Sequence, residues 1–262
     1  MNKQDEDDKD EDPTSYCDVG SGSGGGGGGQ GKSLRDGSSD SSEDNETYNK
    51  INEETKRLKA LLDLSKVELG PHVSENNRLH LDSLKTRFAK AAAHASIEDG
   101  HNLLTRILEV VETDKIVFEI IATKSGKCVT DVTRDKHSSK MDQLKITMSV
   151  DVLDCLTGFA HELFHCLQYS TDVIDSSGTR NWDVGDQEFE AFLFEALMKL
   201  QGYLWDVDFD ISAAIEYINH PDEASYKAAY DLYMEERGQN EPYNGYKITE
   251  GLTPQERIKH LY

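Results

Sequence analysis

The chain has 262 residues and a formal net charge of −22, and its 28 Lys and Arg are outnumbered by 50 Asp and Glu. This acidity argues against binding to nucleic acid or to an anionic membrane surface, because both depend on clustered cationic side chains. No apolar run approaches the roughly 18 residues of a membrane span, and the N-terminus lacks the pattern of a secretory signal. We therefore expect a soluble protein, cytoplasmic as given or exported by a route not visible in the sequence.

Residues 1–45 are predicted to form a disordered acidic, Gly/Ser-rich tail. They contain an acidic run at 5–12, six consecutive glycines at 24–29 and very few apolar side chains. Such a segment cannot bury enough apolar surface to offset the entropy lost on ordering. The remaining residues, 46–262, are sufficient for one domain with a single core.

The elements expected in this domain follow the order helices, small sheet, helices. Helical patterns at 47–69, 74–96 and 101–114 give way to strand patterns at 114–123, 127–133 and 143–150. The middle strand is a candidate hairpin partner of the first, through Ser125 and Gly126. Helical patterns return at 151–169, 186–205, 209–220 and 222–237. This order predicts an α+β domain.

The helix expected at 151–169 carries the motif His161-Glu162-Leu163-Phe164-His165, which has the form H-E-x-x-H. Positions i and i+4 of an α-helix lie one turn apart on the same face, so both imidazoles can reach one ion. Zinc takes imidazole nitrogen readily, and catalytic zinc sites combine three protein ligands with a water. Glu162 projects from the adjoining face, where it can accept a proton from that water. The motif therefore predicts one catalytic zinc ion with Glu162 as the general base.

The context of the motif is compatible with two interpretations. Asp151 is a candidate cap for this helix, and its core-facing stripe consists of Leu156, Phe159, Ala160, Leu163 and Leu167. His161 and His165 share an adjacent face with Gly158 and Gln168. They can bind a metal there, or they can be two histidines satisfied by hydrogen bonds in a buried helix.

A third protein ligand has to come from elsewhere in the chain. Gln168 and Thr171 occupy the positions where a metzincin has Gly and His, so that class is excluded. Glu188 and Glu190 follow His165 by 23 and 25 residues, and on a helix they point about 160° apart. Only one of them can bind the ion, and periodicity favours neither. Asp172 and Asp183 are weaker candidates.

Residues 145–200 resemble the gluzincin group of zinc metallopeptidases, in which the third ligand is a glutamate on a following helix. The string Glu188-x-Glu190-Ala191 is similar to the E-x-E-A element of ImmA/IrrE-type and CAAX-protease-type families, and bacterial effector and toxin zincins combine H-E-L-x-H with the same element. The resemblance implies a zincin-like domain with His161, His165 and Glu188 as zinc ligands. Phe192 departs from it, because the relatives have Asp or Asn there to support the site.

The resemblance further implies hydrolysis of peptide bonds in a protein or peptide substrate by a metal-activated water. In similar zincins the strand before the active helix pairs with the substrate, which here would be 145–150. Candidate donors to the transition state are Tyr203, Tyr217, His220, Tyr226 and Tyr230, and the sequence does not select among them. Two alternatives remain open: a catalytically silent zincin-like binding module, and a zinc hydrolase acting on a small amide.

Overall fold

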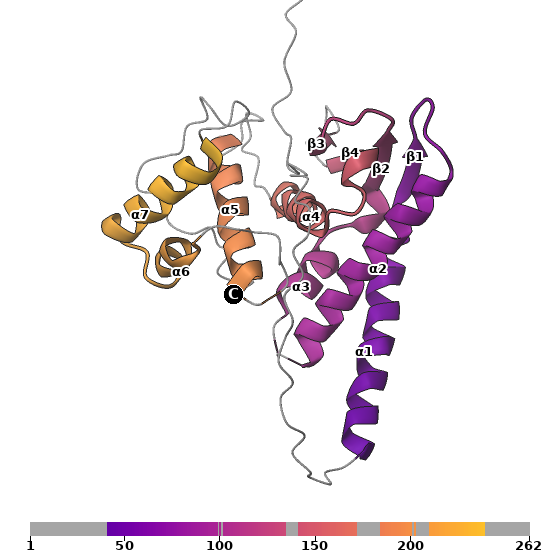
Figure 1. Cartoon of the computed structure of the whole chain (residues 1–262), viewed down its shortest axis with the longest axis horizontal. Helices are drawn as coiled ribbons and strands as arrows, with labels where there is room; N and C mark the ends of the chain where they lie inside the picture. Colours follow the sequence, from indigo (N-terminus) through magenta and orange to yellow (C-terminus); the bar gives the residue numbers. More distant parts are fainter. Residues whose placement is uncertain are drawn as a thin grey trace, which may run out of the picture.

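The computed structural model describes residues 41–98, 100, 102–134, 141–171, 184–200, 202 and 210–238, which form a mixed helix and sheet structure (Figure 1). The first half contains α1 (Ser41–Leu62), β1 (Lys66–Leu69), α2 (Asn76–Ile97), α3 (Leu103–Val110), β2 (Ile116–Ile121), β3 (Cys128–Arg134) and β4 (Met141–Ser149). The second half contains α4 (Leu156–Thr171), α5 (Val184–Leu200), α6 (Ser212–Asn219) and α7 (Glu223–Tyr233). Short helical turns lie at Thr113–Lys115, Val150–Val152 and Met234–Gly238. The predicted combination of helices with a small sheet is confirmed, although β1 lies between α1 and α2, and residues 1–40 of the predicted tail lie outside this description.

The four strands form one sheet in the order β1-β2-β4-β3. β1, β2 and β4 run parallel, and β3 is antiparallel to β4. Ile146 of β4 lies in register with Phe118 of β2 on one side and with Thr130 of β3 on the other. β4 is therefore an inner strand, and β3 is the edge strand nearest to α4.

Three expectations for this sheet were wrong. Residues 66–69 form β1 and not the end of the first helix, because Val67 and Leu69 belong to a strand paired with β2. Residues 127–133 are not a hairpin partner of 114–123, since β3 pairs with β4. The strand at 145–150 cannot accept a substrate strand, because β2 and β3 occupy both of its edges.

The core is continuous from the sheet to α4. The Phe159 ring of α4 lies 5.6 Å from Phe118 of β2 and 5.6 Å from Phe88 of α2, measured between centroids. All three rings are fully buried. Because such aromatic contacts add to the free energy gained from buried apolar area, they fix the position of α4 against the sheet.

The start of α4 differs from the expectation. Asp151 does not cap the helix, because it lies in the preceding turn, where its carboxylate accepts hydrogen bonds from Ser149 Oγ and the Gly126 amide. The helix begins instead at Leu156. Asp151 therefore ties the end of β4 to the turn that precedes β3.

The second half of the structure packs on the other side of α4 (Figure 1). α5 contacts α4, and the pair α6–α7 packs on α5 through a cluster of aromatic rings around Phe189. None of the described helices combines the length and apolar character needed to cross a bilayer. α4 thus has a sheet on one flank and a helix on the other, and the motif histidines lie on the flank that faces α5.

Candidate metal centre

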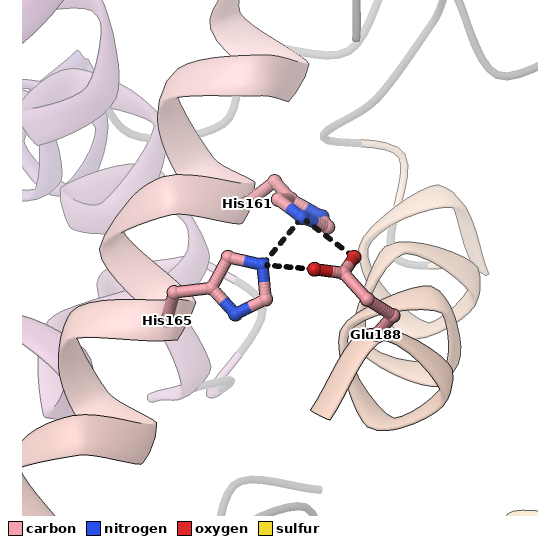
Figure 2. A group of neighbouring side chains, drawn as sticks. All are labelled: His161, His165 and Glu188. Atoms are coloured by element: carbon pink, nitrogen blue, oxygen red, sulfur yellow. Dashed lines mark hydrogen bonds and ion pairs between the residues drawn. The ribbon is translucent and has the colours of Figure 1, made fainter. Parts of the chain in front are cut away.

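His161 and His165 project from successive turns of α4 toward Glu188 on α5 (Figure 2). The Nε2 atoms of the two histidines are 2.7 Å apart. Glu188 Oε2 lies 3.6 Å from His161 Nε2, and Glu188 Oε1 lies 3.4 Å from His165 Nε2. The three side chains are between 2% and 8% exposed. Three buried potential ligands from two helices therefore converge on one point.

The spacing of these atoms fits a zinc site. Their potential ligand atoms all lie within 4.8 Å of one another. Tetrahedral ligands at about 2.0–2.2 Å from zinc are separated by about 3.3–3.6 Å, and each histidine lies at such a distance from a different oxygen of Glu188. The two Nε2 atoms are closer than this because they share a hydrogen bond. Binding of an ion requires the loss of that shared proton and a small separation of the rings.

Each histidine is hydrogen-bonded through its other nitrogen. His161 Nδ1 lies 2.9 Å from Glu195 Oε1, and His165 Nδ1 lies 2.6 Å from Gln168 Oε1. Both partners are fully buried acceptors. An acceptor at Nδ1 keeps a proton there, so loss of the proton between the two Nε2 atoms leaves both Nε2 lone pairs for a metal, which is the tautomer that a ligating histidine needs.

The structure separates the two candidate glutamates. Glu188 faces the histidine pair, whereas Glu190 Oε2 accepts a hydrogen bond of 2.7 Å from Gln168 Nε2. The weaker candidates Asp172 and Asp183 lie outside the described residues. On α5, therefore, Glu188 lies at the convergence point and Glu190 supports a neighbour of His165.

Glu162 lies on the face of α4 that is turned toward the sheet. It is 2% exposed, and its Oε2 accepts a hydrogen bond of 2.7 Å from Thr130 Oγ1 of β3. Burial raises the pKa of Glu162, although the nearby charges of His161 and His165 partly oppose the shift. A carboxylate with a raised pKa has the proton affinity that a general base requires at neutral pH.

The site contains more buried negative than positive charge. Burial alone would lower the pKa of His161, but Glu188 and Glu195 outweigh it and raise this pKa to about 10. Burial would likewise raise the pKa of Glu188, yet its two histidine partners hold it well below the usual range. Lys85, the one buried Lys or Arg in the described part of the chain, bonds to the end of α1. A divalent cation would add positive charge beside Glu188, to which both histidines are turned.

The candidate tyrosines lie mainly in the aromatic layer beneath α5. Tyr217, Tyr226 and Tyr230 surround the Phe189 ring, with centroids 6.0, 6.1 and 6.4 Å away. His220 follows the last turn of α6, and Tyr203 lies outside the described residues. The described contacts of these tyrosines are those of a core that supports α5.

Three residues that contact the site were not selected from the sequence: Thr130, Gln168 and Glu195. Glu195 could have been found, because it is a charged residue in an apolar stretch, seven residues or two helical turns after Glu188. Gln168, three residues after His165, was placed on the histidine face and used as evidence against a metzincin, but no contact with His165 was predicted for it. Thr130 carried no signal, because nothing in the sequence relates its strand to the motif helix.

Comparisons of this chain with protein-family models, with curated proteins and with solved structures find no significant match. The functional interpretation therefore depends on the geometry and chemistry of the His161, His165 and Glu188 cluster and of the residues around it.

Proposed function

We propose that this chain is a zinc-dependent peptidase, in which His161, His165 and Glu188 hold one zinc ion and Glu162 is the general base. One observation carries the proposal: two imidazole nitrogens and a carboxylate from separate helices converge within 4.8 Å, next to a buried glutamate from the same motif. Two nitrogens and one oxygen are a common protein donor set for catalytic zinc.

The fold contributes to this chemistry by fixing orientation. A zinc ion held by His161, His165 and Glu188 would lower the pKa of a bound water to about 7 and would polarise a carbonyl. Glu162 accepts a proton from the attacking water and passes it to the departing amine. Thr130 donates to one oxygen of Glu162 and so restricts the orientation of this carboxylate.

A peptide substrate is supported by the edge of the sheet next to the motif. β1 and β3 are the two edge strands of the described sheet, and of these β3 carries Thr130, the hydrogen-bond partner of Glu162. A peptide that pairs with the free edge of β3 would run past the proposed base and present its backbone carbonyls to the site. The substrate strand is thus assigned to β3 and not to residues 145–150.

The test is a comparison of zinc content and hydrolysis among purified variants. Wild type is expected to hold close to one zinc per chain and to generate new amino termini in a peptide library. His161→Ala should lose the zinc. Glu162→Gln preserves the side-chain volume and should retain the zinc, while hydrolysis falls by about 10²–10⁴-fold. Glu109→Gln, at an exposed position on α3, is the matched control and should behave as wild type.

Two outcomes would contradict the proposal. A wild-type protein that cannot be loaded with zinc has no metal centre, and the histidines are then only hydrogen-bonded core residues. Zinc binding without hydrolysis of any peptide, and with no difference between wild type and Glu162→Gln, would leave a binding module or a hydrolase of another substrate.

A further inference from the structure

Gln168 is a fully buried amide with three polar contacts. Its Oε1 lies 2.6 Å from His165 Nδ1, while its Nε2 donates to the Gln187 carbonyl at 3.0 Å and to Glu190 Oε2 at 2.7 Å. An amide nitrogen has two protons, and both are therefore used on the first turns of α5. The amide oxygen is the only group left to face the histidine.

The two α5 acceptors determine which way this amide points. With the amide reversed, its oxygen would face the oxygens of Gln187 and Glu190, and its nitrogen would face His165. That arrangement places oxygen against oxygen in the core and loses two hydrogen bonds. A buried polar group left without a partner costs on the order of 1–3 kcal/mol. The observed orientation therefore imposes a proton on His165 Nδ1.

The same contacts connect the ligands across the helix interface. Gln168 follows His165 by one helical turn, and Glu190 lies two residues after Glu188. A movement of α5 relative to α4 would thus disturb both the hydrogen bond between Gln168 and His165 and the distance from Glu188 to the histidines. His161 has a simpler arrangement, since Glu195 contacts it directly.

We propose that Gln168 and Glu190 form a positioning clamp, in which the Glu190 carboxylate fixes the Gln168 amide and the amide fixes His165 in the tautomer that can bind a metal through Nε2. The inference rests on the proposed zinc site, but its first consequence, the tautomer of His165, exists without a metal. Glu190 acts through Gln168 and is not a ligand.

The clamp can be distinguished from a buried polar pair that serves only stability. Replacing one partner of such a pair leaves the other unsatisfied, whereas replacing both by apolar side chains of similar size is often nearly neutral for folding. We therefore expect Gln168→Met and Glu190→Met to lower the melting temperature, and the double variant to recover most of the loss. A structural role predicts that zinc binding recovers as well, and the clamp predicts that it does not.

Two measurements on the full chain decide the question. Nitrogen-15 NMR of the histidine rings in metal-free protein, assigned with His165→Asn, should show the proton of His165 on Nδ1 in wild type and a mixture of tautomers in the double variant. Competition with a chromogenic chelator should show a zinc Kd raised about 10–100-fold in the double variant. Glu190→Gln, which keeps the volume, should fold normally and give a Kd raised by about tenfold, at the lower end of that range.

The matched control is Thr105→Val, which removes another buried side-chain hydrogen bond, from Thr105 to the Ala92 carbonyl. It should change neither the His165 tautomer nor the zinc Kd. A folded double variant with wild-type zinc affinity and an unchanged tautomer would overturn the clamp. If wild type binds no zinc, the proposed function fails, and the tautomer measurement alone then confirms or refutes the clamp.

Discussion

Two helix pairs in this molecule are built from opposite chemistry. α1 and α2 meet through apolar side chains that include Leu58, Leu62, Leu81 and Leu84, all at most 1% exposed. Their ion pairs, such as Lys59 with Asp82, lie at the surface. α4 and α5 meet through His161, His165 and Gln168 on one helix and Glu188, Glu190 and Glu195 on the other, and all six are buried. The first interface is mainly apolar, with one buried polar contact from Lys85 to the end of α1, whereas the second contains many buried polar atoms that need partners.

The contrast shows which part of α4–α5 holds the helices together. Their apolar contact includes Phe164 and Phe194, whose rings stack at 4.4 Å between centroids. This contact supplies attachment, and the polar residues can then be arranged for binding. Buried charges that lack a partner cost several kcal/mol, so the polar part contributes stability only when a cation and the hydrogen-bonding network are complete.

The largest expected effect comes from removal of the metal. Stripping zinc from the loaded protein with a chelator should lower its free energy of unfolding by about 4 kcal/mol at a free zinc concentration of 1,000 times the Kd. Hydrogen exchange should accelerate in α4 and α5, where the ion joins the helices. It should accelerate less in α1 and α2, because local openings of their apolar contact do not involve the ion.

Glu188→Gln is the control for this experiment, because it keeps the shape of the side chain while removing the charge that faces both histidines. Its exchange rates should respond little to the chelator. Equal acceleration of exchange in both helix pairs of the wild type would mean that the two interfaces are not independent, and the contrast drawn between them would be wrong.

The sequence predicted the part of the site that one helix contains. The spacing of His161 and His165 needs only an α-helix to bring both rings together, so a local rule was sufficient. The position of Glu188 depends on the angle between α4 and α5, which no local pattern specifies, and the choice over Glu190 came from resemblance. The support of Glu162 by Thr130 depends on strand order, and the expected hairpin had placed that strand beside the wrong neighbour.

Strand β1 shows the same limit in another place. Residues 66–69 continue a helical pattern, but four backbone partners in β2 stabilise an extended conformation. A short segment with low intrinsic preference follows its tertiary contacts. The mixture of helices and sheet was predictable because long periodic segments determine it, whereas the order of the strands depends on contacts between residues that are distant in the sequence.

An intermediate effect on zinc affinity is expected at Glu195, whose carboxylate is hydrogen-bonded to His161 Nδ1. Glu195→Ala removes the acceptor of the Nδ1 proton and should raise the zinc Kd by about 10–100-fold. Glu195→Gln keeps an acceptor oxygen in the same volume and should retain most of the affinity. Chelator competition measures both. If Glu195→Ala bound zinc as tightly as wild type, the polar packing of α4–α5 would have no role in the metal centre.

The smallest effect concerns Lys85 on α2, the one buried Lys or Arg among the described residues. Its Nζ donates to the Leu62 carbonyl and to Ser65 Oγ, and it lies 4.9 Å from the centre of the Phe118 ring. Burial lowers the pKa of Lys85 to about 8 from an ordinary 10.5, despite the opposing charges of Asp63 and Asp82. Relative to the unfolded chain, the folded protein therefore stabilises the neutral form of the Lys85 amine.

The direction of the pH dependence follows from this shift. Between about pH 8 and 10.5 the unfolded chain binds more protons at this residue than the folded protein does, so the contribution of Lys85 to stability rises with pH and is lost as pH falls through 8. Denaturant unfolding at several pH values should give wild type a slope steeper than that of Lys85→Met by at most about 1.4 kcal/mol per pH unit. Lys66→Met, at an exposed position on β1, is the control and should keep the wild-type slope. Identical slopes for wild type and Lys85→Met would contradict this prediction. They would show that the pKa of Lys85 is not lowered in the folded protein and that water reaches its amine.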